Sequence, residues 1–126
     1  MPVGLSATLA NSWLNMLRGV AFTAPAGTFL ALRTGDPGAA GATNASVVTT
    51  RVTATYSAAA GGSIVLSNVP SFAMTATETI THIAVFDAAT AGNFLWSAVL
   101  GTPRSVVNTD TLNLNGATLS LAALAS

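Results

Sequence analysis

The sequence contains no lysine and has few charged residues of either sign. Its 126 residues include four arginines and four acidic side chains, so 6% of the chain is charged and the formal net charge is zero. About 25% is the usual charged fraction of a globular domain. A surface so poor in charge does not keep copies of a protein apart by repulsion. We therefore expect a subunit that works packed against copies of itself or against other partners.

The shortage of basic residues also argues against nucleic acid as a partner. Arg18, Arg33, Arg51 and Arg104 are far apart in the sequence and form no basic run. Binding to a phosphate backbone depends on clustered basic side chains. A phosphate-binding P-loop would require a lysine after its glycines, so nucleotide binding is not expected either.

The chain lacks cysteine and long apolar runs as well. Without cysteine there are no disulfides and no thiolate metal sites. No apolar stretch approaches the ~20 residues that a membrane-spanning helix requires. No basic residue precedes the first apolar stretch, so the N-terminus does not resemble a signal peptide. We expect a soluble protein with no membrane association.

The length fits a single domain over residues 1–126, because two halves would each be too small to bury a useful core. The strongest pattern is a central hairpin over residues 79–100. Two apolar runs rich in β-branched and aromatic residues flank a turn that includes Asp87 and Gly92. Phe94 and Trp96 are expected on one face of the second strand.

The opposite face of that second strand is also apolar, at Leu95 and Val99. A strand that is apolar on both sides is usually covered on both sides. We therefore expect a core on one side of the hairpin, and either the N-terminal helix or another subunit on the other side.

Residues 6–18 form the one good helix candidate. Ser6 is suited to cap the first turn, and Gly19 is suited to a left-handed stop. Leu9 and Trp13 begin an apolar stripe at helical spacing that continues to Met16 and Leu17. The stripe requires a partner, either the subunit's own sheet or a neighbouring subunit.

Residues 34–46 are a loop by composition, with Asp36-Pro37-Gly38 as a turn. We expect this loop to be exposed and to make contacts. The remaining pattern predicts short strands separated by frequent turns, with a loop at 101–103 and a two-residue hairpin at Asn115-Gly116. Together these features predict a mainly β fold, an antiparallel β-sandwich of about eight strands with one N-terminal helix, and a jelly roll as the specific topology.

The ionisable residues offer little for catalysis, for a metal or for a cofactor. His82 is the one candidate base, and the alternation places it on the same face as Ile80, as a structural histidine. Glycosidases use a pair of carboxylates. The four candidates, three of which fall in predicted turns or loops, are Asp36, Glu78, Asp87 and Asp110. We expect no enzyme, no metal and no cofactor. Carbohydrate binding stays open, because an exposed Trp13, Tyr56 or Trp96 would offer a stacking face.

The order of residues resembles a family of small virion structural proteins of tailed bacteriophages, described as tail-fibre, minor tail or head decoration proteins. The resemblance covers nearly the whole chain. The segments that carry it are GLSATLANSWLNML, FLALRTGDPGAAGATNAS, THIAVFDAATAGNFLWSAVL and NLNGATLSLAAL, and LRTGDPG and FDAATAGNFL are the most specific. The resemblance implies a jelly-roll-like fold, a non-enzymatic structural role and assembly in copies, often trimers.

Three hypotheses follow. The first is a homotrimeric virion protein, assembled in the cytoplasm of the host bacterium, that contacts other capsid or tail proteins; without fibre-like repeats in the sequence, a capsid decoration protein is favoured. The second is a minor tail or tail-fibre protein that binds a host receptor or glycan. The third, a small hydrolase, would depend on His82. The residues expected to contact other subunits are Leu9, Trp13, Asp36, Pro37, Leu95 and Val99.

Overall fold

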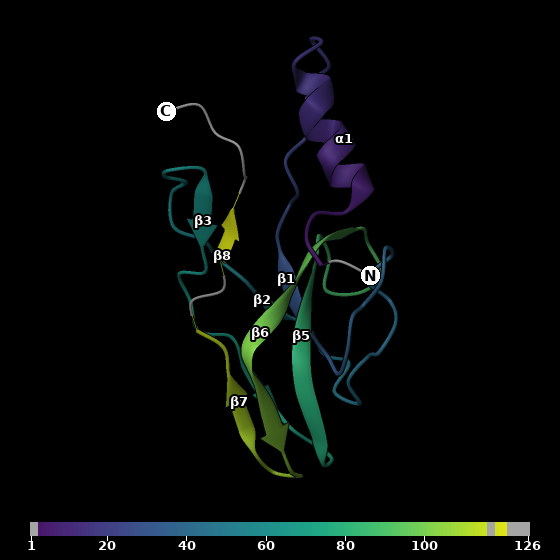
Figure 1. Cartoon of the computed structure of the whole chain (residues 1–126), viewed down its shortest axis with the longest axis vertical. Helices are drawn as coiled ribbons and strands as arrows, with labels where there is room; N and C mark the ends of the chain where they lie inside the picture. The colour runs from purple at the N-terminus through teal and green to yellow at the C-terminus, as the bar shows by residue number, and fades with distance from the viewer. Residues whose placement is uncertain (1–2, 116–117, 121–126) are drawn as a thin grey trace.

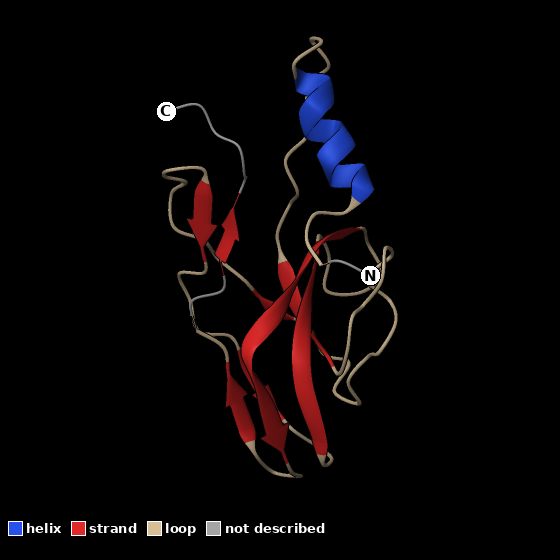
Figure 2. Cartoon of the chain, viewed as in Figure 1, coloured by secondary structure: helices blue, strands red, loops and turns tan. Residues whose placement is uncertain are grey.

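Strands dominate the structure, with one helix at its end (Figures 1 and 2). The computed structural model describes residues 3–115 and 118–120. In chain order the elements are α1 (Ala7–Met16), β1 (Phe29–Arg33), β2 (Val52–Thr53), β3 (Ser63–Val65), β4 (Ser71–Ala73), β5 (Glu78–Phe86), β6 (Phe94–Val106), β7 (Thr111–Asn113) and β8 (Thr118–Ser120). The predicted mainly β fold with one N-terminal helix is confirmed.

One sheet contains four antiparallel strands in the order β2-β1-β5-β6. The predicted hairpin is β5 and β6, in which Ile83 pairs with Ala98. On its other side β5 pairs with β1, so that Leu30 lies opposite Val85. The prediction of a central hairpin is confirmed for β5, which is interior to the sheet, and is wrong for β6, which is the last strand.

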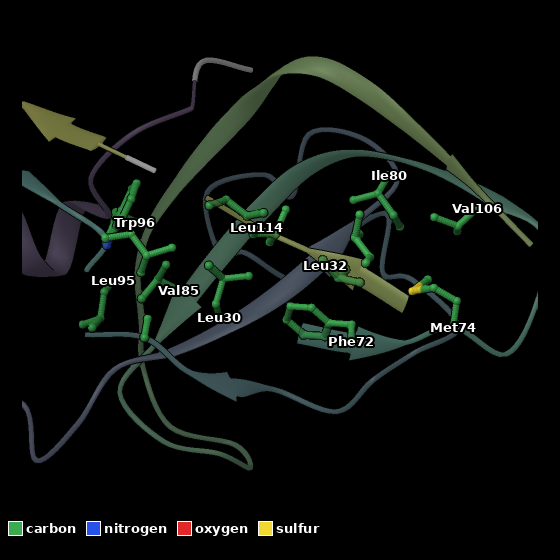
Figure 3. Close-up of a cluster of buried hydrophobic side chains, with 14 of the residues drawn as sticks. Leu30, Leu32, Phe72, Met74, Ile80, Val85, Leu95, Trp96, Val106 and Leu114 are labelled. Carbon is green, nitrogen blue, oxygen red and sulfur yellow. The ribbon is translucent and has the colours of Figure 1, made fainter. Parts of the chain in front are cut away.

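Two short ladders, β3–β8 and β4–β7, form a second layer against this sheet. Side chains of both layers interdigitate in one buried cluster, in which Phe72 and Met74 from β4 and the segment after it meet Leu30 and Leu32 of β1 (Figure 3). The arrangement is that of an antiparallel sandwich. The jelly-roll topology stays a prediction, because the second layer is two separate ladders and not one continuous sheet.

Two bulges decide which side chains of the hairpin face the core. Ile80 pairs with Arg104 while His82 pairs with Val99, so the register shifts at Thr81. As a result Ile80 shares the core cluster with Ile83, and the prediction that His82 lies on the same face as Ile80 is wrong. Between these two pairs β5 has one residue, Thr81, whereas β6 has four, residues 100–103. An irregularity of this kind breaks the regular alternation of side chains between the two faces.

The second bulge is at Leu95. Val85 pairs with Trp96 and Phe86 pairs with Phe94, which leaves Leu95 as the extra residue. Leu95 and Trp96 therefore both enter the main core, whereas Phe94 packs in a separate cluster with Phe86. The prediction that Phe94 and Trp96 share a face is wrong for this reason.

The loop at residues 34–46 covers the second face of the sheet. Arg33 donates hydrogen bonds from Nε and Nη2 to the carbonyl of Gly41, at 3.1 and 2.8 Å. The backbone of Gly41 lies directly on the Phe94 ring, and Pro37 is fully buried. The prediction of an exposed loop is therefore wrong at its buried positions. Within the subunit, this loop and not the helix packs on the ring of Phe94.

The C-terminal strands do not form the predicted hairpin. Within the described residues, β7 pairs with β4 and β8 pairs with β3, so the chain passes from one ladder to the other between them. Gly116 of the predicted turn lies outside the described residues. The predicted loop at 101–103 is also wrong, because β6 continues through it to Val106. Pro103 is tolerated there because β6 is a last strand, where a missing N–H leaves no ladder bond unmade.

Helix α1 projects from the end of the sandwich (Figure 1). As predicted, Ser6 caps it, accepting a hydrogen bond from the Leu9 amide at 3.1 Å, and Gly19 has a left-handed φ of +87°. Leu9 is buried in the core and Trp13 packs against it. Leu17 is 87% exposed, so the far half of the predicted stripe is largely uncovered by the residues that the structure describes. The helix of the described region lacks the length and apolar character that crossing a membrane requires.

Candidate functional site

A hollow with a volume of about 430 Å³ lies beside α1. Its walls are the first half of α1, the segment 22–26 and the start of β6 with the loop before it. The lining residues are Thr8, Leu9, Ser12, Phe22, Thr23, Ala24, Pro25, Ala26, Asp87, Asn93, Phe94 and Leu95. Pockets of about 300–1,000 Å³ are typical of small-molecule sites. We refer to this pocket as the hollow.

The loop between β5 and β6 closes around one carboxylate. Asp87 accepts hydrogen bonds from the backbone and side-chain nitrogens of Asn93, at 2.7 and 2.9 Å. Gly92 adopts a φ of +76°, and a Cβ on it would lie 2.4 Å from Asp87 Oδ1. The backbone hydrogen bond from Asn93 holds the pKa of Asp87 below its usual value. Asp87 is therefore ionised and fixed in orientation at neutral pH.

Arg51 braces the same loop from the strand side. Its Nη1 donates to the carbonyls of Ala88 and Ala91, at 2.8 and 2.6 Å. The guanidinium lies over the Phe86 ring, with Cζ 3.7 Å from the ring centre. Arg33 approaches the same ring at 5.6 Å. Cation–π contacts and charge-assisted hydrogen bonds of this kind make the loop a fixed wall of the hollow.

The chemistry of the hollow suits a neutral ligand with many hydroxyls. Thr8, Ser12 and Thr23 bring hydroxyl groups, and Phe22 and Phe94 bring aromatic surface. Among the described residues that line it, Asp87 is the one ionisable side chain. Arg51 interacts electrostatically with Asp87 but does not line the hollow. A fixed negative charge in the wall disfavours anionic ligands such as phosphates and sugar acids.

A second depression, of about 200 Å³, lies between α1 and the β3–β8 ladder and is almost entirely apolar. It is lined by Leu9, Trp13, Phe22, Pro25, Thr28, Tyr56, Ile64, Leu95, Trp96 and Leu119. We refer to it as the groove. The three aromatic residues considered for sugar stacking all line it, and Trp96 is only 3% exposed. The Tyr56 hydroxyl is buried and has no hydrogen-bond partner in the described part of the chain. A site this poor in hydrogen-bonding groups suits an apolar occupant and not a sugar.

The residues predicted to contact other subunits are in different places. Leu9, Trp13 and Leu95 come together in the groove. Asp36 accepts a hydrogen bond from Gly38 N at 2.8 Å within its own turn. Of the other two, Pro37 is buried and Val99 on β6 is 59% exposed. Their role as subunit contacts stays a prediction, and Pro37 offers no surface for it.

The residues that were weighed as catalytic candidates, with no enzyme expected, each have a local hydrogen-bond partner. His82 Nδ1 lies 2.8 Å from the Thr81 hydroxyl, within the bulge of β5. Glu78 is hydrogen-bonded to the Ser46 hydroxyl, and Asp110 accepts from Val107 N at 3.0 Å. Each described carboxylate thus holds a turn or a loop end. No group of three potential metal ligands occurs within residues 3–115 and 118–120.

The sequence analysis missed the residues that shape the hollow. Asn93 lies in FDAATAGNFL, which carries the family resemblance and turn chemistry but does not by itself indicate a pocket. Arg51 enters the sequence analysis only as one of four arginines that form no basic run. Thr23 and Pro25 belong to a segment with no regular pattern, so nothing local predicts that they meet α1 and the β5–β6 loop.

The described residues thus form an antiparallel β-sandwich from whose end a helix projects. The comparison with protein families then assigns the chain. Residues 4–122 match the family model described as "Gp80: Podophage GP4 fiber I protein gp80". The chain belongs to this family and is a structural component of a phage virion. None of the curated proteins searched matches the sequence.

Proposed function

We propose that this chain is a non-enzymatic fibre subunit of a podophage particle. The observation that carries the proposal is the family match over residues 4–122, since the family is described by a fibre protein. That description favours the tail-fibre hypothesis over capsid decoration. The low charge and the exposed apolar end of α1 support assembly in copies, for which a homotrimer is the proposed form.

We further propose that the fibre attaches to the host by binding a neutral carbohydrate of the bacterial surface in the hollow. Three features support this role: the hydroxyls and the amide in its walls, the fixed Asp87 carboxylate, and the aromatic surface of Phe22 and Phe94. Carboxylate and amide groups accept and donate hydrogen bonds to sugar hydroxyls, while aromatic rings pack against the apolar face of a sugar.

The test is a glycan array followed by titration of the sugars that bind. Thr23 is exposed at the rim, so Thr23→Tyr fills the hollow without disturbing the core. We expect at least a tenfold rise in Kd for Thr23→Tyr. Thr49→Tyr is the matched control, because Thr49 is exposed and does not line the hollow. A folded wild-type protein that binds no bacterial surface glycan, or equal weakening by both variants, would contradict the carbohydrate role.

A further inference from the structure

The far end of α1 and the turn after it form an apolar surface. Leu14, Met16, Leu17 and Val20 are 62%, 47%, 87% and 44% exposed. We refer to these four residues as the tip. Exposed apolar side chains scattered singly are normal, whereas four within seven residues on a projecting helix indicate a contact surface. Arg18 is the one charged residue in this part of the chain.

The groove at the base of the same helix has the complementary shape and chemistry. Its lining includes Leu9 and Trp13, which begin the stripe that the tip continues. The stripe is therefore half buried in its own subunit and half exposed at the end of the molecule. The groove is concave and the tip is convex, and no residue that lines the groove is charged.

We propose that the tip of one subunit inserts into the groove of a second copy of this chain. A copy is the favoured occupant because the same chain carries both apolar surfaces, and because a net charge of zero opposes no approach between copies. A charged partner would lose hydration in the groove without gaining an ion pair, because no residue that lines the groove is charged. Leu9, Trp13 and Leu95, expected from the sequence to contact other subunits, then do so as walls of the groove.

The size of the tip bears on how the copies are arranged. A stable interface buries about 800 Å² on each partner, and four side chains provide less than this. The tip and the groove are different patches, so the contact between two copies is head-to-tail. In a closed ring every subunit inserts its tip into one neighbour and receives the tip of the other, and so makes two such contacts. This arrangement rests on the homotrimer proposed above, but the tip-in-groove contact does not depend on what the hollow binds.

The absence of cysteine allows a clean cross-linking test. Protein with Leu17→Cys is mixed with protein carrying Ile64→Cys, subunits are allowed to exchange, and oxidised glutathione is added. We expect a disulfide between the two chains. The matched control replaces Leu17→Cys by Val69→Cys, because Val69 is 52% exposed and lies away from the tip. Cross-linking no greater than in this control would overturn the proposal.

A second measurement does not require subunits to exchange between oligomers. Light scattering over a range of concentrations gives the apparent Kd of self-association. We expect Leu17→Asp to raise this Kd at least tenfold and Val69→Asp to leave it unchanged. A monomeric wild type, or an oligomer that withstands Leu17→Asp, would overturn the proposal. A disulfide from Ile64→Cys to another virion protein in place of a copy would also overturn it. Glycan binding is also measured for Leu17→Asp, so that a failure of the tip-in-groove contact can be distinguished from a failure of the attachment role.

Discussion

The guanidinium of Arg51 lies over the ring of Phe86, with Cζ 3.7 Å from the ring centre, and reaches past it to the carbonyls of Ala88 and Ala91. A residue just before β2 thus holds the loop between β5 and β6. Through this contact, a residue next to β2 fixes the loop that forms one wall of the hollow.

Arg51→Ala is expected to lower the free energy of unfolding by about 1–2 kcal/mol, because two charge-assisted hydrogen bonds and a partly exposed cation–π contact are lost. Arg51→Lys recovers only part of this, since an ammonium group does not present the same planar fork. Chemical denaturation measures both. Arg18→Ala, at an exposed helix end, is the control and is expected to change stability by less than about 0.5 kcal/mol. Equal losses at Arg18 and Arg51 would contradict the bracing role.

Gly41 is expected to tolerate no side chain. Its φ is +70°, and a Cβ there would lie 2.4 Å from Phe94 Cδ1. Gly41→Ala should cost about 2–4 kcal/mol, combining left-handed strain with overlap in a packed cluster. Gly61→Ala is the matched control, because Gly61 has a φ of +58° and no atom within 4 Å of its Cβ position. That variant should show the strain alone, about 1 kcal/mol. Equal costs would mean that the loop does not pack on Phe94.

Tyr56→Phe is expected to leave stability unchanged or to raise it by up to about 1 kcal/mol. The hydroxyl is buried near the side chains of Trp96 and Thr28 and makes no hydrogen bond of normal geometry among the described residues, and burial raises its pKa. Removing such a group relieves a desolvation cost while the ring keeps its packing against Trp96, 6.4 Å away between ring centres. Thermal unfolding of the two proteins makes the comparison. A loss greater than about 1 kcal/mol would show that the hydroxyl has a partner in solution.

The Asp87 turn predicts a specific dependence on pH. The pKa of Asp87 is lowered in the folded state, chiefly by the hydrogen bond from Asn93 N. A lowered carboxyl pKa contributes stability above the unfolded pKa of about 3.9, and this contribution disappears as the pH falls through the folded pKa. The Tm of the wild type should therefore exceed that of Asp87→Asn at pH 6, and the gap should narrow toward pH 2. A gap that stays constant would exclude the carboxylate as its cause.

The sequence predicts much of this fold because its local signals agree with the final structure. Ser6 and Gly19 delimit the helix, and the alternation of Val48, Val52 and Tyr56 places all three against the core. Side-chain period and capping act over a few residues, so they can be recognised without knowledge of the rest of the chain.

The failures arise where a distant segment decides the outcome. The bulges at Thr81 and Leu95 reverse the faces of their strands, and no local pattern distinguishes a bulge from regular alternation. The loop at 34–46 has the composition of a surface arm, yet Arg33 ties Gly41 down over Phe94. Two segments that are both unremarkable in sequence become a buried contact only after the sheet has formed.

The candidate site was the least predictable part for the same reason. The hollow is assembled from residues 8–12 and 22–26 near the N-terminus and from residues 87–95 much later in the chain, and none of these segments carries a binding motif. What the composition did predict is the kind of protein, since a neutral, charge-poor chain suits a subunit of an assembly.

The central claim is that this subunit belongs to a fibre, and electron cryo-microscopy of intact particles tests it most directly. We predict that the sandwich fits density in the fibres attached to the tail, with copies related by rotation about the fibre axis. Density for the same fold on the capsid lattice, with none in the fibres, would contradict the account.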